Sequence, residues 1–228
     1  MTVQFHFLDA FEEIPIRLLQ AVQRELHAAL AQITTLLPIA QVDVVVAPAQ
    51  SKWVIPEYGL TGMSHGKGRI TISIDPDSPH VDDPQREARL LGILAHELHH
   101  VTRMRGPGYG RTLGEALVSE GLAQCFEVEA GAPVPFYGVA LDPGALTRAG
   151  ERARQELGAP MYDHAAWFMG RRGDPAWPRN AGYSLAFALV EDWLAHNDTN
   201  AAAAARAPAA QVLDAWRERN FELPHPMR

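Results

Sequence analysis

Hydrophobic and polar residues follow two different periods along this chain of 228 residues, and the change of period divides it into two parts. In the first part, alternating or β-branched stretches predict strands at residues 2–8, 42–46 and 69–74, with a weaker strand at 53–55. Apolar residues at helical spacing predict a helix over 9–37, which Pro38 ends. The glycine-rich stretch over 59–68 predicts a loop.

From residue 83 onward, the apolar spacing is helical. Asp83 as N-cap and Pro84 at the first helical position predict the start of a helix, and Gly106-Pro107-Gly108 breaks it. Further helices are predicted over 112–131, 143–157, a short stretch from 163, 181–196 and 208–219. The fold class expected is α+β, mostly helical, with a small mixed sheet near the N-terminus packed on the helix that contains residues 96–100.

The composition suits one domain over residues 1–228, with a sheet-containing lobe of about 1–81 and a helical lobe of about 82–228. A hydrophobic content of 47% is enough for a core. The net charge of −7, with scattered basic residues, argues against nucleic acid as a partner. We expect no signal peptide and no membrane span. The single cysteine, Cys125, fits a packed thiol in a reducing cytoplasm.

The pentapeptide His96-Glu97-Leu98-His99-His100 in the first of the later helices carries the candidate chemistry. Residues i and i+4 share one face of a helix, so His96 and His100 can bind one metal ion. Glu97 is placed to accept a proton from a water molecule beside them, which is the arrangement for metal-assisted hydrolysis. Hydrogen-bonded histidines in an ordinary buried helix are the alternative.

A zinc site that catalyses needs a third protein ligand, and two histidines with one carboxylate form an accepted set. Glu120 is the candidate. Thr112 and Glu115 have the form of a capping box that starts a second helix containing Glu120. The predicted cofactor is therefore Zn²⁺, one per chain, bound by His96, His100 and Glu120.

These motifs resemble those of the thermolysin-type zincins known as gluzincins, in which His-Glu-x-x-His is followed by a glutamate in a later helix. The segments Ser119–Ala123 and Gly182–Leu185, together with Gly62 and the strand Ile70–Pro76, are similar to those of a bacterial family of predicted zinc-dependent proteases, catalogued as a domain of unknown function. The resemblance covers about residues 42–216. It implies a zincin-like fold, zinc-dependent hydrolysis of peptide bonds, and a peptide or protein substrate.

Under this resemblance Glu97 is the general base. The tetrahedral oxyanion needs a second donor, and the placement of Gly-Tyr at the start of a late helix points to Tyr183. A core tyrosine is the alternative reading of Tyr183, and His164 and Tyr109 are substitutes for the role.

The thermolysin-like pattern also has an acid one helical turn after the third ligand, where it orients a histidine. Here that position is Gln124, an amide that can accept an imidazole N–H but adds no charge. Glu127, a further turn on, can supply the charge, although an exposed helix glutamate is the simpler interpretation.

Zincins hold an extended peptide against an edge strand through backbone hydrogen bonds, and this points to the strand with Ile70 and Ile72 as the substrate strand. Three rival functions are considered. Gly62-x-Ser64-x-Gly66 matches the nucleophile elbow of serine hydrolases, but that elbow requires a preceding strand and a following helix, and here a strand is predicted to follow. A non-catalytic zinc protein and a zinc hydrolase of a non-peptide amide are the others. Oligomeric state is not predicted.

Overall fold

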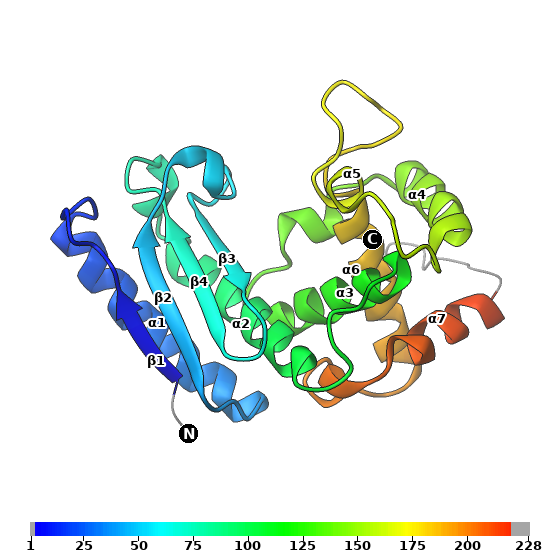
Figure 1. The fold of residues 1–228 in the computed structure, drawn as a ribbon, viewed down its shortest axis with the longest axis horizontal. Helices are drawn as coiled ribbons and strands as arrows, with labels where there is room; N and C mark the ends of the chain where they lie inside the picture. Colours follow the sequence, from blue (N-terminus) through cyan, green and yellow to red (C-terminus); the bar gives the residue numbers. More distant parts are fainter. Residues whose placement is uncertain (1–2, 220–228) are drawn as a thin grey trace. The chain divides into compact units, whose positions relative to one another are not determined.

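The computed structural model describes residues 3–219, so Thr2, where the first predicted strand begins, lies outside the described residues. The α+β class is confirmed, with the small mixed sheet near the N-terminus (Figure 1). The strands are β1 (Val3–Phe7), β2 (Val42–Pro48), β3 (Leu60–Ser64) and β4 (Arg69–Ile74). The α-helices are α1 (Ile16–Leu36), α2 (Arg86–Met104), α3 (Leu113–Glu129), α4 (Pro143–Glu156), α5 (His164–Phe168), α6 (Ala181–His196) and α7 (Ala209–Glu218). Short 3₁₀ helices are η1 (Ser51–Trp53), η2 (Pro79–Val81), η3 (Phe136–Val139) and η4 (Ala203–Arg206).

The chain forms two compact units, one of residues 1–105 with 127–133 and one of residues 106–126 with 134–228. The predicted lobe boundary near residue 81 is therefore displaced to Arg105. The reason is that α2 packs on α1, β3 and β4, so it belongs with the sheet. Helix α3 is continuous and contributes residues to both units. That the whole chain acts as one domain stays a prediction.

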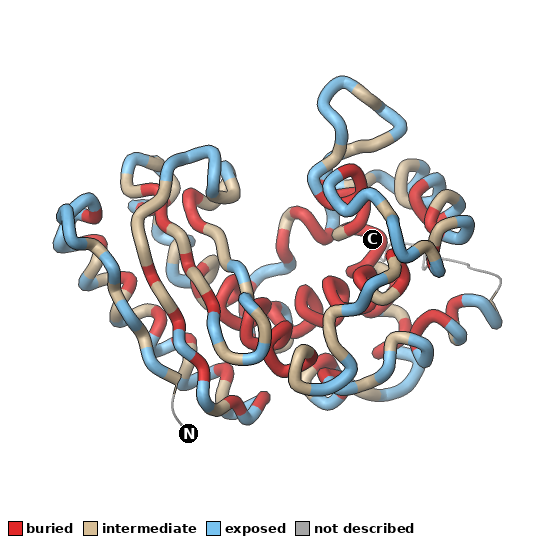
Figure 2. The backbone as a smooth tube through the Cα atoms, in the orientation of Figure 1, coloured by how far each residue is buried: buried red, intermediate tan, exposed pale blue. Residues whose placement is uncertain are grey.

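The sheet of the first unit has the order β1-β2-β4-β3, in which β1, β2 and β4 are parallel and β3 is antiparallel to β4. One face is apolar: Val42, Val44 and Val46 of β2 and Ile70, Ile72 and Ile74 of β4 are all buried. The alternation of buried and more exposed positions is visible along both strands in Figure 2. A strand buried on one face exposes every second side chain, as the sequence period predicted.

Three local predictions in the first unit were wrong. The helix expected from residue 9 begins at Ile16, because the Asp9 carboxylate accepts hydrogen bonds from the amides of Glu13 and Ile14 and holds a turn there. The strand expected at 53–55 is replaced by η1, with only an isolated bridge at Ile55. Part of the expected loop over 59–68 is the strand β3, since pairing with β4 outweighs the poor strand propensity of its glycine.

The start of α2 also differs from the prediction. Its N-cap is Gln85 and its first residue is Arg86, so Asp83 and Pro84 precede the helix instead of starting it. The Asp83 carboxylate instead accepts a hydrogen bond from the Gln85 amide and pairs with Arg89 at 3.0 Å. The predicted capping box of α3 is confirmed, because Glu115 N donates to Thr112 Oγ1 and Thr112 N donates to the Glu115 carboxylate.

Helix α6 is the centre of the second unit, where it contacts α4, α5, α7 and η3. It also passes very close to α3 at Gly121, where an added Cβ would lie 2.2 Å from the carbonyl oxygen of Ala186. Only glycine permits this approach of two backbones. Position 121 directly follows Glu120, so the contact holds that part of α3 against the core of its unit. Among residues 3–219, no helix combines the length and the apolar character needed to cross a bilayer.

Candidate metal centre and active site

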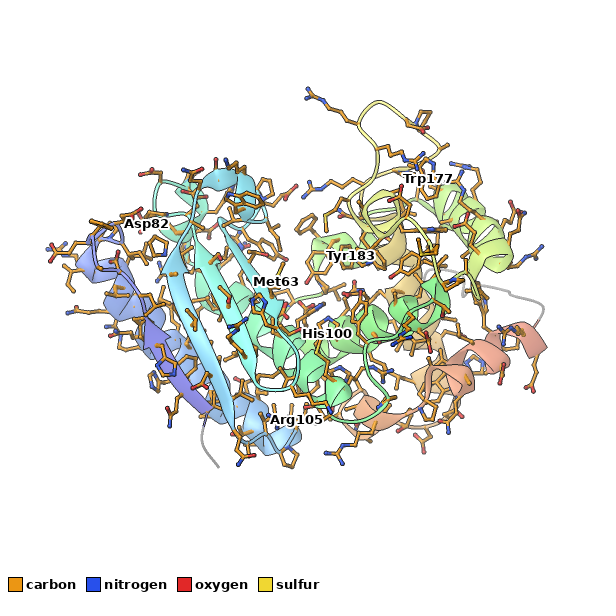
Figure 3. All side chains as sticks on the ribbon, viewed as in Figure 1. Met63, Asp82, His100, Arg105, Trp177 and Tyr183 are labelled. Carbon is orange, nitrogen blue, oxygen red and sulfur yellow. The ribbon has the colours of Figure 1, made fainter. Side chains whose placement is uncertain are left out.

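Helix α2 presents His96 and His100 on one face, as the spacing predicted. His100 is labelled in Figure 3. Their Nε2 atoms lie 3.0 Å apart, and both residues are buried. Two nitrogens that each bind one zinc ion at about 2.1 Å can be at most about 4.2 Å apart. The two imidazoles are therefore spaced as ligands of a single ion.

Glu120 on α3 completes a group of possible metal ligands. One ligand atom from each of His96, His100 and Glu120 can be chosen so that all lie within 4.8 Å of one another. Two neutral imidazoles and one carboxylate match the donors that zinc accepts in catalytic sites. The residues thus fit the metal that the sequence predicted.

Glu127 orients the first of these histidines. Its Oε1 atom lies 2.7 Å from His96 Nδ1, and the side chain is buried, so the interpretation of Glu127 as an exposed helix glutamate was wrong. The carboxylate accepts the Nδ1–H of His96, which leaves Nε2 as the nitrogen that can bind a metal. Gly92, one turn before His96, leaves the space for this carboxylate, because an added Cβ would lie 3.0 Å from Glu127 Oε2.

Glu97 lies under the edge strand β3. Gly62 pairs with Ile72, whose buried side chain points to the helical side of the sheet, so a side chain at position 62 would point the same way. An added Cβ there would lie 2.6 Å from Glu97 Cγ and 2.9 Å from Glu97 Oε1. The absence of a side chain at Gly62 therefore lets the strand backbone rest against the Glu97 carboxylate.

The substrate strand was placed wrongly in the sequence analysis. β4 is paired on both sides, with β2 and with β3, and Ile70 and Ile72 are fully buried core residues. The edge next to α2 is β3, which bears Met63 as an exposed side chain. The error follows from the missed strand: once 60–64 is read as a loop, β4 becomes the outermost strand.

Gln124 is fully buried and ties α3 to α6. Its Nε2 atom donates to the carbonyl of Glu120 at 3.3 Å and to the carbonyl of Tyr183 at 3.2 Å. The amide therefore joins the backbone of the third candidate ligand to the backbone of the candidate oxyanion donor. A role toward an imidazole, as the sequence analysis suggested, stays a prediction.

Tyr183, labelled in Figure 3, lies in the first turn of α6. It belongs to a cluster of aromatic rings. Its ring centroid lies 5.1 Å from that of Tyr137 and 4.8 Å from that of Phe168, and its side chain is half-buried. The cluster continues through His164, which stacks on Phe168 and whose Nδ1 lies 3.0 Å from the hydroxyl of Tyr162. Tyr183 is thus held by ring packing.

Tyr109 contacts Glu120 directly. Its hydroxyl donates to Glu120 Oε1 at 2.7 Å. Burial, and then the negative charge of Glu120, raise the pKa of Tyr109 far above its usual value, so the phenol keeps its proton and acts as the donor. Of the two substitutes named for Tyr183, Tyr109 therefore already has a partner in the candidate metal site.

Two contacts were not predicted from the sequence, those of Gly62 with Glu97 and of Tyr109 with Glu120. The contact of Glu127 with His96 was one of two alternatives, and its signal is that Glu127 follows Glu120 by seven residues and shares its helix face. The nucleophile-elbow reading is contradicted, because Ser64 ends a strand and the chain continues into another strand, β4. Such an elbow needs a helix at that point.

Comparison with known families agrees with the chemistry of these residues. A family model described as predicted Zn-dependent protease (DUF2268) matches residues 22–214, which include strands β2, β3 and β4, the pentapeptide and α6. No curated protein and no solved structure matches the chain. Since the match spans most of the 228 residues, the chain belongs to this family of predicted zinc-dependent proteases.

Proposed function

We propose that this protein is a zinc metallopeptidase of the gluzincin type, with one zinc ion per chain held by His96, His100 and Glu120. The observation that carries the proposal is that one possible ligand atom from each of these three residues lies within 4.8 Å of the others. Glu97 directly follows His96 in the chain, and Glu127 orients the His96 ring. Family membership supports zinc and proteolysis at a coarse level. A cytoplasmic location stays a prediction.

Zinc, when bound, supplies Lewis acidity that polarises a carbonyl and acidifies a water molecule. Glu97 accepts the proton of the attacking water at its carboxylate and passes it to the leaving amine. Its burial at 7% exposure and its contact with the Gly62 backbone hold the carboxylate in one place, so little reorganisation is needed for the proton transfer. The Tyr183 hydroxyl donates to the oxyanion that forms on the substrate.

The peptide is proposed to pair with β3 in place of β4. An edge strand has unpaired backbone N–H and C=O groups on its outer side, and an extended peptide can hydrogen-bond to them. Because Gly62 of this strand touches Glu97, a peptide alongside β3 lies near the general base. Backbone pairing recognises an extended conformation more than particular side chains.

Replacing Gly62 by alanine should reduce activity without removing zinc. The added methyl group overlaps Glu97 Cγ and Ile93 Cγ2 and displaces the carboxylate. A displacement of this kind lowers kcat by about 10- to 100-fold. Zinc content should equal that of wild type, since no ligand is touched. Gly68→Ala is the matched control in the same hairpin, where the new Cβ meets only one atom, at 3.4 Å. Equal kcat values for Gly62→Ala and Gly68→Ala would show that Gly62 has no part in positioning Glu97.

Replacing Tyr183 by phenylalanine should lower kcat by about 10²-fold and change KM little, as for other donors that act mainly in the transition state. The ring packing with Tyr137 and Phe168 is kept, so the melting temperature should stay close to that of wild type. Tyr137→Phe controls for loss of a hydroxyl in the same cluster. A fully active Tyr183→Phe protein would identify Tyr183 as a packing residue. His164 would then be the next candidate for the oxyanion donor.

The direct test of the proposed function combines elemental analysis of the purified protein with digestion of a peptide library. About one zinc per chain and cleavage that a chelator abolishes and zinc restores are the expected results. Bound zinc without any cleavage would favour a non-catalytic zinc protein. Cleavage of small non-peptide amides without cleavage of peptides would favour a zinc hydrolase of a non-peptide amide.

A further inference from the structure

We infer that Tyr109 is a positioning residue for the metal ligand Glu120, an inference that rests on the proposed function. The hydroxyl of Tyr109 donates to Glu120 Oε1 at 2.7 Å, a short bond between a phenol and a carboxylate. A hydrogen bond to a ligating carboxylate fixes its rotation and its orientation toward the ion.

The segment that contains Tyr109 is hydrogen-bonded to α3 at two places, Ser119 and Glu115. Ser119, which is fully buried, donates its hydroxyl to the carbonyl of Tyr109 at 2.7 Å. About one helical turn before Ser119, Glu115 accepts hydrogen bonds from the amides of Arg111 and Thr112 at 2.7 and 3.0 Å. Tyr109 is thus anchored by the residue that directly precedes Glu120 and cannot move far from the carboxylate it contacts.

The approach of this segment to α3 needs glycine beside the tyrosine. Gly110 has φ of +107°, and an added Cβ there would lie 2.2 Å from Glu115 Cβ. The conformation and the space both exclude other residues. The segment between α2 and α3 therefore holds the Tyr109 hydroxyl against the Glu120 carboxylate, in addition to connecting the two helices.

The hydrogen bond has a consequence for the mode of binding. With Oε1 engaged by Tyr109, Oε2 would be the oxygen of Glu120 that binds an ion, and binding through one oxygen would be favoured over binding through both. A carboxylate without this bond can rotate, and the free energy of ordering it then reduces the affinity for the metal.

The test is Tyr109→Phe, which removes one hydroxyl and keeps the ring. Zinc affinity, measured by competition with a chelator, should fall by about 10- to 100-fold. The visible spectrum of the Co²⁺-substituted protein should change because the carboxylate ligand reorients. The melting temperature of the metal-free protein should stay near that of wild type. Tyr162→Phe is the control, because its hydroxyl meets His164 instead of Glu120.

Unchanged zinc affinity and an unchanged Co²⁺ spectrum in Tyr109→Phe would overturn the inference. If that variant does not fold, Ser119→Ala takes its place: it releases the Tyr109 backbone, should weaken zinc binding by a smaller factor, and overturns the inference if affinity is unchanged. Failure of the proposed function is separate, since it would appear as a wild-type protein that binds no zinc or cleaves no peptide.

Discussion

Glu97→Gln is expected to keep a full complement of zinc and to lose at least about 100-fold in peptide hydrolysis. The amide has nearly the shape of the carboxylate, so the contact with Gly62 is retained, but it cannot accept the proton of the attacking water. The measurements are zinc content by elemental analysis and kcat/KM on a peptide found in the library digest.

Glu87→Gln is the matched control for this prediction, because Glu87 is an exposed residue in the first turn of the same helix. It removes the same charge from α2 without touching the candidate site. If Glu97→Gln were as active as Glu87→Gln at equal zinc content, Glu97 would have no part in the proton transfer.

His100→Ala is expected to lose most of its zinc and with it all measurable hydrolysis. Two ligands are left of three, and catalytic zinc sites need three protein ligands. Glu120→Ala should behave in the same way. Elemental analysis after dialysis measures the zinc, and circular dichroism of the metal-free proteins shows whether each variant is folded.

His65→Ala serves as the control for His100→Ala, since His65 is an exposed histidine whose side chain meets Thr71. It should keep about one zinc per chain. Unchanged zinc stoichiometry in both His100→Ala and Glu120→Ala would show that the metal, if any, is bound elsewhere.

The amino-acid sequence by itself determined the parts of this protein that depend on residues close together in the chain. His96 and His100 share a face because a helix repeats every 3.6 residues, and the capping box at Thr112 and Glu115 spans a single turn. The strands β1, β2 and β4 were predictable because one face of each is less exposed than the other, which imposes alternation.

Only the tertiary structure decided which strand forms the edge, which acid meets His96 and which phenol meets Glu120. β3 contains Gly62 and has a poor strand pattern, and it is a strand because β4 supplies its hydrogen bonds. Glu127 has the composition of a surface residue and is buried because His96, 31 positions earlier, needs an acceptor. These contacts join residues on different elements, and a local period gave a signal for only one of them, through the position of Glu127 seven residues after Glu120. Their free energy comes from partners that folding brings together. Local spacing in the sequence could therefore name candidate ligands, whereas most of the contacts that orient these residues depend on the tertiary structure.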